Sequence, residues 1–123
     1  MKPLEVRVAP ENSIVFVSDL SWEHEIALDS IGTAPIVATP SCIAIGTLAQ
    51  HSGETTIRIG DAFDNPEAEP AFDTTLETPG RTVSVTGARL ENFLSMRVKN
   101  PVTNFKIWVN ARDEPSLVII QAQ

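Results

Sequence analysis

The sequence predicts an all-β fold, a predominantly antiparallel β-sandwich of about nine or ten short strands. Val, Ile and Thr each occur 11 times, against 8 Leu, in a chain of 123 residues. Side chains branched at Cβ suit pleated strands and lose rotamer freedom in helices. Nine Pro and six Gly interrupt the chain at short intervals, which argues against several long helices. Turn signals recur at the spacing that is typical of a sandwich or a small barrel.

The first half of the chain contains five clear strand patterns. Leu4 to Val8 alternates apolar and polar residues, as a strand with one solvent-exposed face does. Ile14 to Val17 is a continuous apolar run, typical of a strand covered on both faces. Ile36 to Thr39 lies between two prolines and predicts a short edge-like strand. Cys42 to Leu48 and Thr55 to Ile59 complete this set.

Residues 21–32 fit two structures. As a helix, the segment would begin with Ser21 as N-cap and end at Gly32. As a strand, it would place four large side chains on one face: Trp22, His24, Ile26 and Leu28. We expect the strand, because a period of two fits these residues better than the helical period.

The segment from Asp61 to Pro79 differs from the rest of the chain. It carries six carboxylates, three prolines and no Lys or Arg. Such a composition favours a long surface loop. We therefore expect an acidic, proline-rich loop at about residues 61–79, with a brief extended piece around Ala71 to Leu76.

Regular strands resume after the Pro79-Gly80 turn. The expected strands contain Val83 and Val85, then Phe93 to Val98, Phe105 to Val109 and Leu117 to Ala122. The last three should form a consecutive antiparallel meander. No composition shift marks a linker, so residues 1–123 are expected to form a single domain.

Apolar side chains of these strands should share one core. The predicted core consists of Val6, Val8, Ile14, Phe16, Ile26, Leu28, Ile43, Ile45, Ile57, Ile59, Val83, Val85, Leu94, Phe105, Ile107, Leu117 and Ile119.

The formal net charge is −7, from 9 basic and 16 acidic residues. This balance argues against binding to nucleic acid, which needs clustered Lys and Arg. The excess lies in two blocks, Asp19 to Asp29 and Asp61 to Glu77. Acidic surfaces can steer basic proteins toward them, although the same charge can simply maintain solubility. The residues expected to bind a basic partner are Trp22, Glu23, Glu25, Asp61, Asp64, Glu67 and Glu69.

Residues for catalysis or metal binding are few. Cys42 is a single cysteine, so we interpret it as a small buried apolar residue of a strand. His24 and His51 could reach a common metal only by convergence in space, and the acidic loop lacks the Gly of a calcium-binding loop. The sequence contains no nucleophile elbow or phosphate-binding loop. We therefore predict no catalytic residue, no metal and no cofactor.

The chain also lacks the features of export or membrane insertion. The N-terminus has no apolar stretch of the kind that a signal peptide needs, and no segment is long and apolar enough to span a membrane. We expect a cytoplasmic protein without a membrane partner.

A pattern along the whole chain resembles a known family. An aliphatic first strand is followed by Asp19, the WEHEIALDSIG segment (Trp22 to Gly32) and IAIGT (Ile43 to Thr47). GETTIRI (Gly53 to Ile59) and the closing strands NFKIWV and SLVIIQA come next. This order resembles the competence protein J family of small acidic proteins, whose members inhibit a partner nuclease. The resemblance implies an inhibitor-like β-sandwich.

The leading functional hypothesis is a non-catalytic protein-binding module that presents acidic loops to a basic partner, as a nuclease inhibitor or immunity protein does. Two alternatives remain at this stage. One is a homo-oligomeric assembly module, in which edge segments such as Ile36 to Thr39 pair between subunits. The other is a small ligand-binding or metal-dependent barrel enzyme built around His24 and His51.

Overall fold

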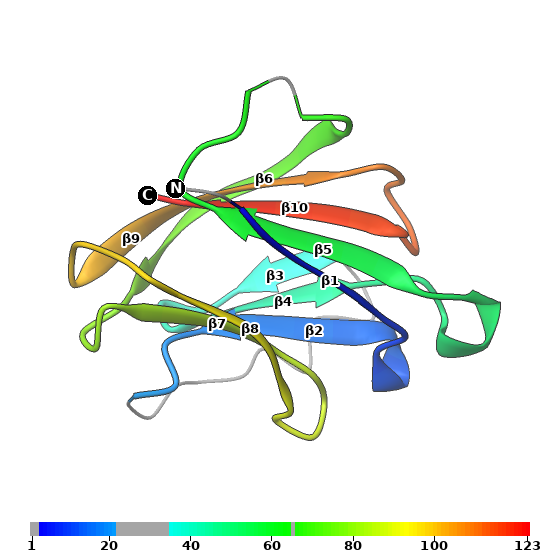
Figure 1. Ribbon diagram of the computed structural model, residues 1–123, viewed down its shortest axis with the longest axis horizontal. Helices are drawn as coiled ribbons and strands as arrows, with labels where there is room; N and C mark the ends of the chain where they lie inside the picture. Colours follow the sequence, from blue (N-terminus) through cyan, green and yellow to red (C-terminus); the bar gives the residue numbers. More distant parts are fainter. Residues whose placement is uncertain (1–2, 22–34, 65) are drawn as a thin grey trace.

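A computed structural model describes residues 3–21, 35–64 and 66–123. Two sheets pack face to face, with sheet A above sheet B in Figure 1. Sheet A contains β1 (Leu4–Val8), β5 (Thr55–Gly60), β6 (Glu69–Glu77), β9 (Val102–Val109) and β10 (Leu117–Ala122). Sheet B contains β2 (Ile14–Ser18), β3 (Ile36–Ala38), β4 (Cys42–Gly46), β7 (Thr82–Thr86) and β8 (Asn92–Arg97). The predicted all-β sandwich is confirmed.

The strand order shows that both sheets are open. Sheet A has the order β1-β5-β10-β9-β6, and sheet B has the order β3-β4-β2-β7-β8. All neighbouring pairs are antiparallel except β5 with β10, which is parallel. Each sheet therefore ends in edge strands, and the two sheets do not close into a barrel.

The core lies between the sheets. Ile57, Ile107 and Ile120 of sheet A face Val17, Ile45 and Val85 of sheet B in one apolar cluster. All six are fully buried. Burying one such side chain contributes about 1.5–3 kcal/mol, so this layer supplies most of the favourable free energy of folding.

Part of the predicted core is placed differently. Ile14 and Phe16 are buried, but they form a separate cluster with Cys42 and Ala44 on the outer face of sheet B. Their neighbours Val15 and Val17 face the other sheet instead. Both runs, Ile14 to Val17 here and Leu117 to Ile120 in β10, are apolar at every position. These runs show no alternation of apolar and polar residues, so the sequence could not determine which side chains point inward.

The same correction applies to β10. Val118, Ile120 and Ala122 face the inter-sheet core, whereas Ile119 is buried outside it and Leu117 is only half-buried. Val6, Val8 and Leu94 pack against the core and are partly buried. Ile26 and Leu28 lie outside the described residues.

The predicted meander of the last three strands is wrong. β8 pairs with β7 in sheet B, while β9 and β10 form a hairpin in sheet A. The chain crosses from one sheet to the other at the Asn100-Pro101 turn. A turn signal shows where the chain reverses, but not which sheet receives the next strand.

The predicted acidic loop is shorter than residues 61–79. Strand β6 begins at Glu69 and runs for nine residues to Glu77, antiparallel to β9. From Phe72 to Glu77, half-buried or buried residues alternate with exposed ones, and Leu76 is fully buried. This alternation, rather than the charge of the segment, determines its structure.

The helix and strand interpretations of residues 21–32 concern a segment that, apart from Ser21, lies outside the described residues.

Cys42 is fully buried, as predicted, and burial raises the pKa of its thiol to about 12. At neutral pH this thiol is protonated and apolar in character. In the described part of the chain, no helix is long and apolar enough to cross a membrane.

A buried carboxylate joins the end of β2 to the turn before β7. Asp19 is fully buried. Its Oδ1 accepts hydrogen bonds from the backbone N–H and hydroxyl of Ser21, and its Oδ2 accepts one from Gly80 N at 2.6 Å. Burial alone would raise the pKa of Asp19, but these hydrogen bonds favour the carboxylate and lower the pKa below its ordinary value of 3.8.

Replacing this carboxylate by an amide should destabilise the fold in a pH-dependent way. Asp19→Asn should lower the free energy of unfolding at neutral pH by about 1.5–3 kcal/mol, because charged hydrogen bonds are lost. The pKa of Asp19 is lower in the folded state, so its contribution is present above the unfolded pKa and disappears as pH falls through the folded pKa.

Urea denaturation from neutral to acidic pH measures this effect. The difference between wild type and Asp19→Asn should shrink as the pH falls below 3.8. Glu54→Gln, at an exposed position, is the control and should resemble wild type throughout. A difference that stays constant with pH would contradict the role assigned to Asp19.

Candidate partner-binding surface

The acidic segment after β5 is held on the outer face of sheet A by Phe63. The backbone N–H of Phe63 donates to Gln121 Oε1 at 3.2 Å. Its ring meets Trp108 edge to face, with 6.3 Å between the ring centroids. A Cβ at Gly60 would lie 3.3 Å from this ring, so glycine gives the ring room to pack against the end of β5. The start of the acidic segment is therefore anchored to the sheet.

Trp108 is the centre of this outer cluster. It lies opposite Ile119 in the β9–β10 register, and only 8% of its surface is exposed. Lys106 Nζ lies 5.7 Å from the centre of its ring, a distance that suits a cation–π interaction. The sequence marked this strand as alternating, but it did not show that Trp108 would be covered from outside by Phe63.

Four of the seven predicted partner-binding residues are described. Asp61 is half-buried, whereas Asp64, Glu67 and Glu69 are exposed, and Glu69 is the first residue of β6. They lie along one connection that leads from β5 into the edge strand β6. Trp22, Glu23 and Glu25 lie outside the described residues, so the structure does not relate the two acidic blocks.

Two further carboxylates continue this acidic surface along β6. Asp73 and Glu77 are exposed and point to the outer face of sheet A, together with Thr75. Asp73 lies directly opposite Lys106 of β9 in the register. We use the name acidic edge for Asp64, Glu67, Glu69, Asp73 and Glu77.

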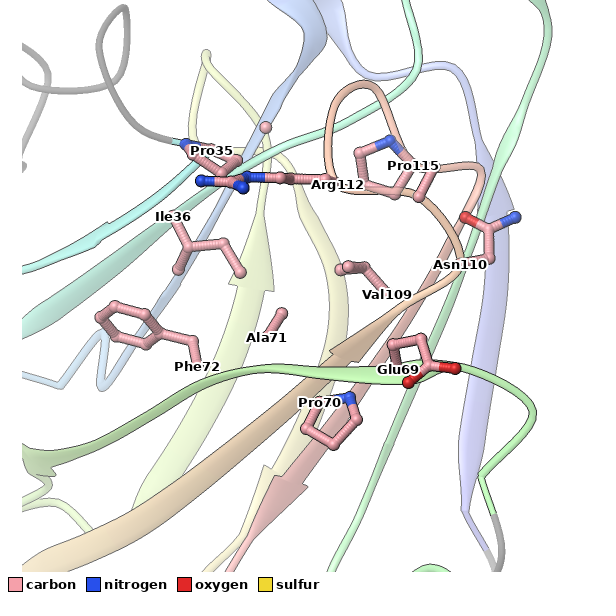
Figure 2. A pocket seen from close by; sticks show the side chains of 12 residues that line it. Pro35, Ile36, Glu69, Pro70, Ala71, Phe72, Val109, Asn110, Arg112 and Pro115 are labelled. Carbon is pink, nitrogen blue, oxygen red and sulfur yellow. The ribbon is translucent and has the colours of Figure 1, made fainter.

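A cavity of about 550 Å³ opens between the two sheets beside the start of β6. Figure 2 shows Ile36 of β3 and Phe72 of β6 side by side at one end, with Val109 of β9 beyond them. Arg112 extends across the cavity toward Pro35, while Glu69 and Pro70 lie on the β6 side. The lining is mainly apolar, and its charged residues are Glu69 and Arg112.

The sequence did not identify Asp73, Glu77 and Phe72 as candidates. Their signal was present in the alternation of residues 72–77, where Phe72, Thr74 and Leu76 face inward and Asp73, Thr75 and Glu77 face outward. The cavity had no such signal, because it forms between residues that are far apart in the chain.

The residues of the alternative metal hypothesis do not come together in the described structure. His51 lies in the exposed 3₁₀ turn Gln50–Ser52. His24 is outside the described residues. Among residues 3–21, 35–64 and 66–123, no three His, Cys, Asp or Glu side chains approach one another closely enough to hold a metal ion.

Solved structures with the same fold exist. The chain is similar to ComJ of Bacillus subtilis, described as an inhibitor of the DNA-degrading activity of NucA, with a TM-score of 0.66 and 13% identity. The match covers 99% of this chain and 94% of ComJ. A second similar structure is the crocagin biosynthetic gene J product, with a TM-score of 0.54, 9% identity, and coverage of 97% of this chain and 94% of the other.

No protein-family model and no curated protein matches the chain. The structural similarity at these identities shows the fold. The resemblance to the competence protein J family is thereby confirmed as a resemblance in fold: this is an open sandwich of the kind found in ComJ.

Removing the ring that anchors the acidic segment should weaken the fold modestly. Phe63→Ala loses the edge-to-face contact with Trp108 and should lower the free energy of unfolding by about 1–2 kcal/mol. Leu90→Ala is the control, because 58% of Leu90 is exposed. Thermal denaturation compares the three proteins, and equal stability of Phe63→Ala and wild type would show that the ring does not anchor the segment.

Proposed function

We propose that this chain is a non-catalytic, inhibitor-like protein that binds a basic protein partner, such as a nuclease, through its acidic edge. The support at the level of fold is the similarity to ComJ, a nuclease inhibitor. The similarity is distant, so the function must rest on the chain's own surface.

The observation that carries the proposal is the concentration of negative charge on one connection and one strand. From Asp61 to Gly80 the sequence has six carboxylates and no Lys or Arg. Five of the six, the acidic edge, have exposed side chains. Charges of one sign gathered on a surface raise the encounter rate with an oppositely charged partner.

A nuclease is a suitable partner because it must attract a polyanion. Enzymes that bind DNA present Lys and Arg to phosphate groups. A row of carboxylates can occupy the same basic surface and so exclude the nucleic acid. Trp22, Glu23 and Glu25 belong to the proposal as a second contact, on the basis of the sequence.

The test is inhibition of a DNA-degrading nuclease, and the first enzyme to assay is NucA, which ComJ inhibits. The chain should reduce DNA cleavage by this enzyme, and its affinity should fall with rising salt. Neutralising Asp64, Glu67 and Glu69 together, as Asp64→Asn, Glu67→Gln and Glu69→Gln, should weaken binding about tenfold, since each exposed charge pair contributes little alone.

A matched variant separates local recognition from net charge. Glu54→Gln, Asp113→Asn and Glu114→Gln change the net charge equally at exposed positions outside the acidic edge. This control should bind the nuclease like wild type. Equal weakening by both sets, or salt-independent binding, would contradict the proposed role of the acidic edge.

A further inference from the structure

Strand β6 ends sheet A, and one side of its backbone faces away from the sheet. Thr78 N donates to Pro101 O at 2.6 Å, whereas Glu77 N donates in the opposite direction, to Pro40 O at 2.9 Å. Consecutive residues of a strand direct their backbone groups to opposite sides. Therefore Leu76, Thr74 and Phe72 bond to β9, while Thr75 and Asp73 direct both N–H and C=O to the open side.

The open stretch is bounded at both ends. At the start, Pro70 has no N–H to donate, and the register shifts between Pro70 and Phe72. At the far end, Pro40 occupies the N–H of Glu77. In the described part of the chain no strand pairs with the open side of β6. The backbone groups of Asp73 and Thr75 thus form a short window in which another strand can pair.

The two faces beside this window have different chemistry. On the outer face, Asp73 and Glu77 present exposed carboxylates four positions apart. On the inner side, at the Phe72 end of the window, lies the cavity between the sheets, lined by Ile36, Phe72 and Val109 (Figure 2). A strand added to β6 would extend sheet A over this opening.

We infer that the open edge of β6 is a strand-addition site for an extended segment in which basic and apolar side chains alternate. Residues of a strand alternate between two faces, so Lys or Arg would meet Asp73 and Glu77 on the outer face. The apolar residues would face the space between the sheets, and the cavity beside Phe72 lies at one end of this stretch. This inference rests on the proposed function and names the contact through which the partner binds.

A synthetic peptide tests the site without the natural partner. The probe is an end-blocked peptide of about seven residues in which Lys and Val alternate, a length typical of strands. Its control contains the same residues with the Lys and Val in separate blocks. Hydrogen exchange of the chain's backbone amides is followed by NMR with each peptide. The alternating peptide should slow exchange at Asp73 and Thr75, and the block peptide should not.

Two pairs of variants separate the mechanism from general attraction to an acidic protein. Asp73→Lys with Glu77→Lys should weaken binding of the alternating peptide at least about tenfold. Glu54→Lys with Glu114→Lys changes the net charge equally at exposed positions elsewhere and should have little effect. Thr75→Pro should abolish binding by removing an edge N–H, whereas Thr75→Ala keeps this N–H and should bind normally.

Several results would overturn the inference. These are slowed exchange at another edge, equal binding of the two peptides, or equal weakening by both charge-reversal pairs. Slow exchange at Asp73 and Thr75 that depends on protein concentration without peptide would identify a second copy of the chain as the occupant. Nuclease inhibition that survives Asp73→Lys with Glu77→Lys would reject this site and leave the proposed function intact.

Discussion

Two open sheets that share one apolar layer must end in edge strands. The candidate binding surface of this protein depends on how its edge strands are protected from pairing with other strands. The Ile and Val side chains between the sheets provide the driving force for folding. In the described residues, four strands lie at the ends of the two sheets, and their backbones are paired on one side only: β1, β6, β3 and β8. Unpaired backbone groups attract any available strand, so proteins shorten, charge or cover their edges.

The edges of this protein are protected to different degrees. β3 has only three residues, and β1 has five, with Glu5 paired to Arg58 at 2.7 Å on its outer face. β6 is the longest of the described strands, with nine residues, and its protection consists of Pro70, a register shift and carboxylates. Carboxylates deter pairing with another acidic strand, including a second copy of β6, but they favour a basic one. The carboxylates that protect β6 from pairing with a second copy can therefore also select a basic partner.

The fold class and most strands could be predicted from the sequence, because alternation and turn residues are local signals. Val83 and Val85 of β7 and the alternation of β9 show this well. Three features depended on tertiary structure. The continuous apolar runs of β2 and β10 carry no period, β8 joins a sheet that no local pattern specifies, and the cavity beside Phe72 forms from distant segments. The expected extended piece, Ala71 to Leu76, lies within β6, but the strand is longer than expected. The charge and proline on either side of this piece indicated a loop and so concealed the full length of the strand.

The proposed binding surface requires that one side of the β6 backbone is unpaired, and this can be measured on the free protein. Hydrogen exchange of individual backbone amides, followed by NMR at low protein concentration, reads each N–H along the strand. Leu76 and Thr74 should exchange slowly because they bond to β9, whereas Asp73 and Thr75 should exchange much faster. Equally slow exchange at all four amides would show that the edge is covered in solution and would contradict the account.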